Sequence, residues 1–237
     1  MTKRTVSGVH KMKQSRNKGR VVELTTLNDR PATTFWLIRH GEVEKRYQSV
    51  FGGRIDMQLS PRGHRQAAAL AGYLHHTEFD ALYASPMRRV HQTLAPLRRN
   101  GWPEPVVMPA LREVDFGDWT GLGWDEVETR FGASAYTWLD QMERDAIPGA
   151  ESARAFRARL RPVVRQLLAR HPGQQVAVVC HGGVIRMVLA ILLGWPLPKT
   201  AAFEIDYASV TQVAWAPHKT RLHLVNFAPW REMGRSR

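Results

Sequence analysis

The stretch Phe35-Trp36-Leu37-Ile38-Arg39-His40-Gly41 decides the fold class of this chain. Its four apolar residues precede two polar residues and a glycine, which is typical of a buried strand that runs directly into a loop. Two further segments share the pattern: 81–84 ends at Ser85, and 175–180 ends at His181. We therefore expect three buried strands, each with a polar side chain just beyond its end.

Helical patterns separate these strands. Ser60-Pro61 predicts the start of a helix, because serine favours the N-cap position and proline the first helical position. Further helices are expected at about 87–98, 124–131, 135–145, 156–167 and 184–193, and two late strands near 210–214 and 222–225. This alternation predicts a three-layer α/β/α fold with a mainly parallel central sheet. In such sheets the ligand lies at the carboxyl ends of the strands.

Composition limits the class of protein. The chain has 237 residues, 43% of them apolar, which indicates one globular domain. A single cysteine, Cys180, excludes an intrachain disulfide and makes a reducing compartment the default, so we expect a cytoplasmic protein. The net charge is +13, and residues 1–32 hold eight basic and two acidic residues without any helical or strand period. We expect a disordered basic arm over 1–32 and a domain over 33–237.

The sequence predicts no membrane partner. The longest strongly apolar stretch without a charge, 187–198, is interrupted by glycine and proline and is too short to cross a bilayer. The basic N-terminus has no apolar region behind it, so a secretory signal is not expected.

The polar residues at or just beyond the predicted strand ends form a cation-rich set: Arg39, His40, Arg88, Arg89, Glu113 and His181. Guanidinium groups repel a divalent cation and match phosphate oxygens, so the set favours an anion over a metal ion. A neutral imidazole is a competent nucleophile toward phosphorus. Backbone N–H groups can approach an anion closely at three glycines, Gly41, Gly182 and Gly183. The set therefore points to phosphoryl chemistry.

Six sequence blocks stand in a fixed order between about residues 33 and 228: 37–42, 56–67, 85–93, 111–121, 148–152 and 179–186. Together they resemble the histidine phosphatase superfamily, also called the phosphoglycerate mutase-like family. The Arg39-His40-Gly41 triplet alone is a weak signal, whereas six blocks in the family's order are a strong one. The resemblance implies a phosphoglycerate mutase-like fold.

The resemblance also implies a role for each matching residue. His40 would be the nucleophile that becomes phosphohistidine, and Glu113 the acid that protonates the leaving oxygen and then activates water. The phosphoryl oxygens would be held by Arg39, Arg89 and His181, with the backbone of Gly182 beside them. Arg88 would be a variable surface position. These cations replace a metal ion, so no metal and no cofactor is expected.

The chain departs from the family pattern near the nucleophile. Arg46 and Gly52 stand where the family usually has polar amides, and Val43 replaces a threonine or serine. Substitute contacts to the phosphoryl group could come from Tyr47, Gln48 or Arg54. These departures affect the choice of substrate more than the reaction.

Three functions are compatible with this sequence. The first is a metal-independent phosphatase, a phosphoric monoester hydrolase of the histidine acid phosphatase type, acting on a small phosphorylated metabolite. The second is a cofactor-dependent phosphoglycerate mutase. Mutases carry a long insertion over the site, whereas Glu113 and His181 are only 68 residues apart here, a span nearly filled by three expected helices. The third is a nucleic-acid-binding protein on a degenerate scaffold, against which the intact site residues argue. An α-ribazole phosphate or a sugar phosphate substrate, and a homodimer, stay open.

The remaining conspicuous residues are interpreted as structural. Cys180 is expected to be buried and unreactive, and Trp119 and Trp124 to pack in the core or wall a pocket. A basic helix face is expected to be solvated; it comprises Arg154, Arg157, Arg159, Arg161 and Arg165.

Overall fold

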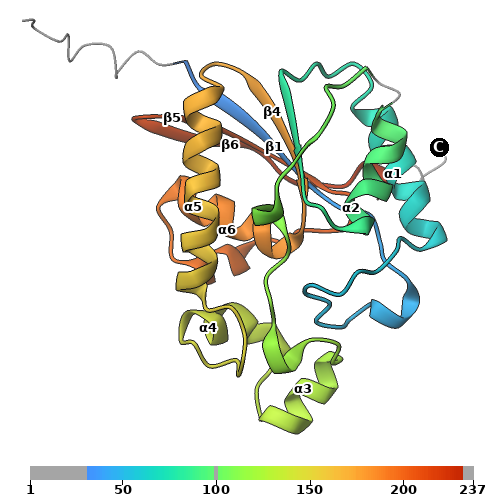
Figure 1. Ribbon diagram of the computed structural model, residues 1–237, viewed down its shortest axis with the longest axis vertical. Helices are drawn as coiled ribbons and strands as arrows, with labels where there is room; N and C mark the ends of the chain where they lie inside the picture. The colour runs from blue at the N-terminus through green and yellow to red at the C-terminus, as the bar shows by residue number, and fades with distance from the viewer. Residues whose placement is uncertain (1–30, 99–100, 232–237) are drawn as a thin grey trace, which may run out of the picture.

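The computed structural model describes residues 31–98 and 101–231 of the chain (Figure 1). Its sheet has the strand order β3-β2-β4-β1-β5-β6. The strands are β1 Thr33–Arg39, β2 Ala81–Ala84, β3 Val106–Val107, β4 Gln175–Cys180, β5 Val210–Ala216 and β6 Lys219–Phe227. The α-helices are α1 Pro61–Tyr73, α2 Arg88–Leu97, α3 Trp124–Phe131, α4 Trp138–Glu143, α5 Ala153–Arg170 and α6 Gly182–Leu193. Short 3-10 helices are η2 Lys45–Tyr47, η4 Pro109–Leu111, η5 Gly117–Trp119, η6 Ala135–Thr137, η7 Leu197–Ala202 and η8 Pro229–Arg231.

The pairing of three central strands brings their polar ends together. β4 lies between β1 and β2 and runs parallel to both, with Arg39 of β1 opposite Cys180 of β4. The residues that follow β2, β1 and β4 are Ser85, His40 and His181. Because parallel neighbours end at the same edge of a sheet, these three residues lie side by side.

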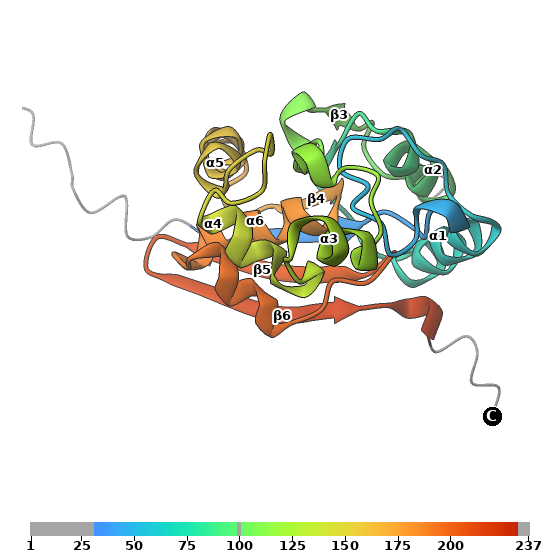
Figure 2. The same ribbon diagram turned by 90° about the horizontal axis from the view of Figure 1, so that it is seen from below.

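Helices cover both faces of the sheet, which confirms the three-layer prediction (Figure 2). Phe35 and Leu37 of β1 share a core cluster with residues of α5 and α6. Ile38, one position on, belongs to a second cluster with residues of α1 and α2. Successive side chains of a strand point to opposite faces, so each face of β1 needs an apolar cover. This explains the nearly continuous apolar runs of the central strands.

The start of α1 follows from its capping residues. The hydroxyl oxygen of Ser60 accepts a hydrogen bond of 2.9 Å from the backbone N–H of Gly63. Pro61 occupies the first helical position, where no N–H group is needed. On the inner face of the helix, Leu70 is fully buried. The predicted N-terminus of this helix is therefore confirmed.

Two parts of the sheet differ from the sequence-based expectation. β3 is absent from the strands expected from the sequence, because its two residues are too few to show any apolar alternation. β5 and β6 are longer than predicted. β5 runs antiparallel to β1, and β6 runs antiparallel to β5. A turn of two residues joins them, and so short a connection cannot make a parallel crossover. The expected helix at 135–145 is divided into η6 and α4.

The predicted arm over 1–32 lies outside the described residues, apart from its last two. Within the described part of the chain, no helix is both long and apolar enough to cross a membrane.

Candidate active site

Two imidazole rings lie together at the carboxyl edge of the sheet. The ring centroids of His40, after β1, and His181, after β4, are 5.2 Å apart. Both side chains are buried, His40 to 5% exposure and His181 to 0%. The predicted pair of strand-end histidines is thus adjacent in space.

The surroundings of His40 assign its tautomer. The carbonyl oxygen of Gly41 lies 2.8 Å from Nδ1 and can only accept, so Nδ1 carries the proton. Nε of Arg89 donates to Nε2 of His40 over 3.2 Å. Nε2 therefore presents a lone pair. Burial lowers the pKa of His40 well below its usual value, and the positive charges of Arg89 and Arg39 lower it further. The ring is neutral, as attack on phosphorus requires.

Arg89 is a buried guanidinium in the first turn of α2, with 2% exposure. Besides His40, it donates to the carbonyl oxygens of Ile55 at 2.8 Å and Gly53 at 2.9 Å. Burial lowers its pKa to about 10, and the charge of Glu113 opposes this shift. One cation thus fixes the nucleophile and the loop in front of it.

Arg39 at the end of β1 is held by a segment far along the chain. It donates to the carbonyl oxygen of Ile205 at 2.5 Å, and its guanidinium carbon lies 4.0 Å from the ring centroid of Tyr207. Its Nε is buried and has no hydrogen-bond partner among the described residues. Tyr207 also approaches the ring of His40, with centroids 5.6 Å apart. Sequence reasoning missed Tyr207, because it lies in no block and follows no period.

Glu113 reaches the site from a loop after η4. Its Oε2 accepts a hydrogen bond of 3.1 Å from the backbone N–H of Gly183, and its Oε1 accepts one of 3.0 Å from Val114. A Cβ atom at position 183 would lie 2.6 Å from Oε1, so any larger residue here would displace the carboxylate of Glu113. Gly182 precedes it in the first turn of α6 and lines the same cavity as Glu113.

His181 is fully buried and is not among the residues that line the cavity. Its Nε2 shares a hydrogen bond of 2.7 Å with the hydroxyl of Ser85, and its Nδ1 is buried without a partner among the described residues. Burial, followed by the charges of Arg89, His40 and Arg39, lowers the pKa of His181 well below its usual value. It is a neutral ring with one nitrogen still free to bind.

Residues of the second and third sequence blocks hold the loop that follows His40. The backbone N–H of Gly41 donates to the hydroxyl of Thr93 at 2.9 Å, and that of Glu42 donates to the side-chain oxygen of Gln66 at 2.8 Å. The hydroxyl of Ser60 donates to the carboxylate of Glu42 at 2.7 Å. These blocks therefore fix the nucleophile loop rather than touch a ligand.

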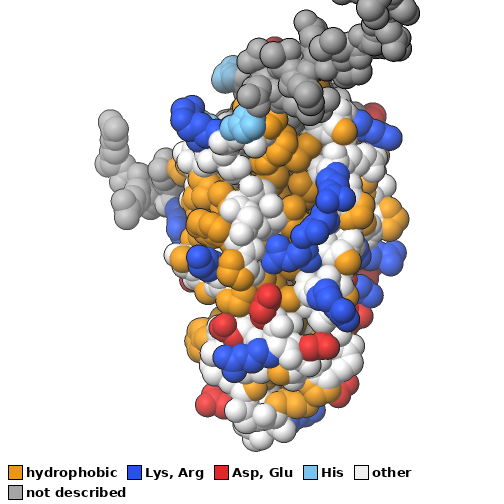
Figure 3. Space-filling view, turned by 90° about the vertical axis from the view of Figure 1, so that its left-hand side faces the viewer, with side chains coloured by type: hydrophobic (Ala, Val, Ile, Leu, Met, Phe, Trp, Pro, Cys, Tyr) orange, Lys and Arg blue, Asp and Glu red, His pale blue; other side chains and the backbone are white. Residues whose placement is uncertain are grey.

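The basic face of α5 is only partly solvated, which corrects the expectation. Lys and Arg side chains do gather on the side of the molecule where α5 lies, and Arg161 and Arg165 are exposed (Figure 3). Arg159, however, turns inward and forms two hydrogen bonds with the carboxylate of Glu151, at 2.6 and 2.7 Å. It also donates to the carbonyl oxygens of Ala110 and Arg112. Arg159 thus anchors the loop that carries Glu113.

A cavity of about 470 Å³ opens above these groups. Arg39, His40, Arg89, Glu113 and Gly182 line its inner part. Residues of α3, η6 and α4 line it as well, and Figure 1 shows α3 and α4 beyond the carboxyl end of the sheet. The expectation that little chain is left to cover the site is therefore wrong. The expected short helices themselves line the cavity, and their length alone could not predict this position.

Of the departures from the family pattern, Arg46 lies away from the cavity, whereas Val43 and Gly52 line it. The side chain of Arg46 is 69% exposed and pairs with Glu44. Gln48 donates to the carbonyl oxygen of Val43, and Arg54 pairs with Asp115 and Glu151. Tyr47 and Gly52 do line the cavity. Of the three substitutes considered, only Tyr47 is placed at the cavity.

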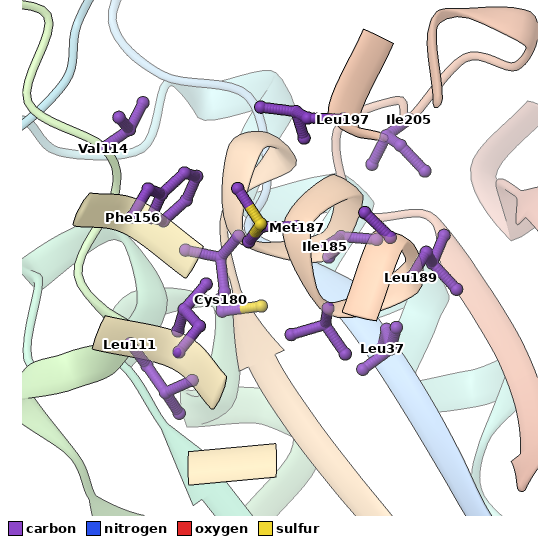
Figure 4. Packing of buried hydrophobic residues seen from close by; sticks show 14 of the residues in the cluster. Leu37, Leu111, Val114, Phe156, Cys180, Ile185, Met187, Leu189, Leu197 and Ile205 are labelled. Carbon is purple, nitrogen blue, oxygen red and sulfur yellow. The ribbon is translucent and has the colours of Figure 1, made fainter. Parts of the chain in front are cut away.

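Cys180 is buried among apolar side chains, as expected (Figure 4). Burial and the charge of Glu113 raise the pKa of its thiol, which opposes formation of a thiolate. Trp119 is 1% exposed and belongs to the core, whereas Trp124 lines the cavity. Arg88 is exposed, as predicted. Within residues 31–98 and 101–231, no three His, Cys, Asp or Glu side chains are grouped as ligands of a metal ion would be.

Comparison with known proteins settles the family. The sequence model of the histidine phosphatase superfamily (branch 1) matches residues 35–228. The chain belongs to the histidine phosphatase superfamily. Three of its relatives are phosphatases, which supports a phosphoric monoester hydrolase.

Individual relatives of this histidine phosphatase carry different names. It is 29% identical to phosphoserine phosphatase 1 of Hydrogenobacter thermophilus over 177 residues, 75% of this chain and 84% of that protein. It is 27% identical to the adenosylcobalamin/α-ribazole phosphatase of Escherichia coli over 171 residues, 72% of this chain and 84% of that protein. The solved structure of a mycobacterial glucosyl-3-phosphoglycerate phosphatase matches with a TM-score of 0.74 and 29% identity, covering 83% of this chain and 99% of that one. The fold is therefore shared, while the three names specify three different substrates.

Proposed function

We propose that this histidine phosphatase hydrolyses a small phosphomonoester through a phosphohistidine on Nε2 of His40. One observation carries the proposal. Nδ1 of His40 is committed to the carbonyl oxygen of Gly41, so the lone pair lies on Nε2, beside the guanidinium of Arg89. A neutral nucleophile next to an anion-binding cation is what transfer of a phosphoryl dianion needs.

In the first step, the hydrogen bond from Arg89 to Nε2 of His40 is released, the Nε2 lone pair attacks phosphorus, and the bond from phosphorus to the leaving oxygen breaks. Glu113 acts as the general acid and gives a proton to that oxygen, so the alcohol leaves neutral. Arg39 and Arg89 hold the phosphoryl oxygens, and each cation at about 4 Å contributes about 4 kcal/mol at an effective dielectric constant of about 20. Nδ1 of His181 has no hydrogen-bond partner within residues 31–98 and 101–231, which supports its role as a further contact to these oxygens.

In the second step, a water molecule attacks phosphorus and the bond to Nε2 breaks. The carboxylate of Glu113 takes a proton from that water, inorganic phosphate leaves, and His40 returns to its neutral form. The cations of the site do in this scheme what metal ions do in other phosphoryl transfers. The proposal is therefore that activity persists in a chelator.

Several finer expectations stay predictions: the histidine acid phosphatase type of hydrolase, a cytoplasmic location and a homodimer. A mutase would return the phosphoryl group to a second hydroxyl instead of water. The phosphatase relatives favour water as the acceptor.

Brief incubation with a phosphate-labelled substrate, quenching in alkali and peptide mapping test the proposal. Phosphohistidine survives alkali and is lost in acid. The label is expected on the peptide that contains His40 and should be absent in His40→Ala. His181→Ala should slow labelling but not abolish it. Label on His181, or label that persists in His40→Ala, would overturn the assignment.

A further inference from the structure

The outer part of the cavity is lined by aromatic side chains that the reaction does not use. Trp124 at the start of α3 is 39% exposed, and Tyr136 in η6 is 78% exposed. Their rings meet edge to face with centroids 5.0 Å apart. Exposed aromatic rings that line a cavity offer a flat apolar surface to a ligand.

This aromatic wall is fixed to the loop in front of the nucleophile. The backbone N–H of Trp124 donates to the carbonyl oxygen of Ser49 at 3.2 Å, and Val50 forms a β-bridge with Gly123. The same loop continues to Gly53, whose carbonyl oxygen binds Arg89. The wall therefore has a set position relative to His40, as a subsite for the rest of the substrate requires.

The charges around this outer part balance without a ligand. Asp206 is paired with Arg231 at 2.5 Å. One Nη atom of Arg186 donates hydrogen bonds to the carbonyl oxygens of Thr200 and Phe203. The negative charge of Glu204 stabilises the charged form of Arg186. Glu204 itself has no hydrogen bond or salt bridge within the described ranges. Arg39 and Arg89 would be occupied by a phosphoryl group. Among the described residues that line the cavity, the one further Lys or Arg is then Arg186, whose charge is opposed by that of Glu204.

We propose that Trp124, Tyr136 and Glu204 form a subsite for an uncharged leaving group that carries a ring, as in a nucleoside or a sugar. The inference rests on the proposed function and deepens it. The ring lies against the aromatic wall, and Glu204 disfavours a leaving group with a carboxylate or a second phosphate. The cavity volume of about 470 Å³ fits a ring-bearing ligand, since small-molecule sites span about 300–1,000 Å³.

Four alkyl phosphates separate the two features. The leaving groups of adenosine 5′-monophosphate and glucose 6-phosphate carry an uncharged ring. The leaving group of glycerol 3-phosphate is small and uncharged, and that of 3-phosphoglycerate is small and carries a carboxylate. At least one ring substrate should exceed glycerol 3-phosphate in kcat/KM by about tenfold, and 3-phosphoglycerate should be the poorest. Trp124→Ala should remove most of the ring advantage, because it lowers kcat/KM for the ring substrate about tenfold more than kcat/KM for glycerol 3-phosphate. Phe131→Ala is the matched control, because Phe131 is an exposed aromatic of the same helix that does not line the cavity.

Glu204→Gln tests the charge. It leaves Arg186 uncompensated, so the ratio of kcat/KM for 3-phosphoglycerate to that for the ring substrate should rise about tenfold. An unchanged ratio, or a loss in Trp124→Ala that is equal for all four substrates, would overturn the subsite.

Binding of the ring substrates to His40→Ala, measured by calorimetry, separates the two proposals. In His40→Ala, a ring substrate should bind more tightly than glycerol 3-phosphate, and the double variant His40→Ala/Trp124→Ala should lose this difference. That result supports the subsite even if no phosphate is hydrolysed. Hydrolysis of all four substrates without any such difference keeps the phosphatase and refutes the subsite.

Discussion

Replacing Gly183 by alanine should displace the carboxylate of Glu113 without unfolding the protein. The added Cβ atom would lie 2.6 Å from Oε1 and 3.2 Å from Cδ of Glu113, so the carboxylate has to move. It ends a flexible side chain and can rotate away, at the loss of its 3.1 Å hydrogen bond from the Gly183 N–H. Alanine is favoured over glycine inside a helix by about 1 kcal/mol, which offsets that loss. We expect the free energy of unfolding to change by no more than about 1 kcal/mol.

The activity of this variant should fall far more than its stability. A general acid contributes about 10²- to 10⁴-fold, so kcat on glycerol 3-phosphate should drop about 100-fold. The loss on p-nitrophenyl phosphate should be smaller, because its leaving group departs without a proton. Gly182→Ala adds the same methyl group where the nearest atom, Nε of Arg39, is 3.5 Å away, and should lose much less. Steady-state kinetics and thermal unfolding make the comparison. A folded Gly183→Ala protein with the wild-type rate on glycerol 3-phosphate would refute the role of Glu113.

Two further predictions concern stability. Burial, Arg89 and Arg39 lower the pKa of His40, so the unfolded chain binds a proton at a higher pH than the folded protein. The free energy of unfolding should therefore fall as the pH drops below about 6.5, less steeply in His40→Asn; equal slopes in urea titrations would contradict this. Arg159→Ala leaves the carboxylate of Glu151, only 10% exposed, without its main partner and should cost about 3 kcal/mol, with little recovery in Arg159→Lys. A loss below about 1 kcal/mol in urea unfolding would show that the pair is not an anchor.

The central strands could be predicted because burial on both faces demands an uninterrupted apolar run. The expected strands at 81–84 and 175–180 coincide with β2 and β4. The site could be predicted because neighbouring parallel strands end at the same edge of the sheet. His40, Ser85 and His181 follow these strand ends. These features depend on local sequence and on a general rule of sheet topology.

The features that sequence reasoning missed depend on tertiary contacts. Arg159 has the spacing of a solvated helix face, and only the position of Glu151 and the 110–112 backbone turns it inward. Tyr207 stacks on Arg39 from the far end of the chain, and nothing in its local sequence marks it. The helices at 124–143 were predicted, yet their packing over the site could not be derived from their length.

A continuous series of contacts joins the nucleophile to the outer wall of the cavity. Nε2 of His40 accepts from Arg89, Arg89 binds the carbonyl oxygen of Gly53, and the chain runs back from there to Ser49, which binds the backbone of Trp124. A leaving group that packs on Trp124 therefore presses on the loop that orients Arg89. Binding energy from a part of the substrate that does not react can in this way hold the reacting groups in place, and it then raises kcat as well as affinity. Loss of the ring from the substrate should for this reason lower kcat and not only raise KM.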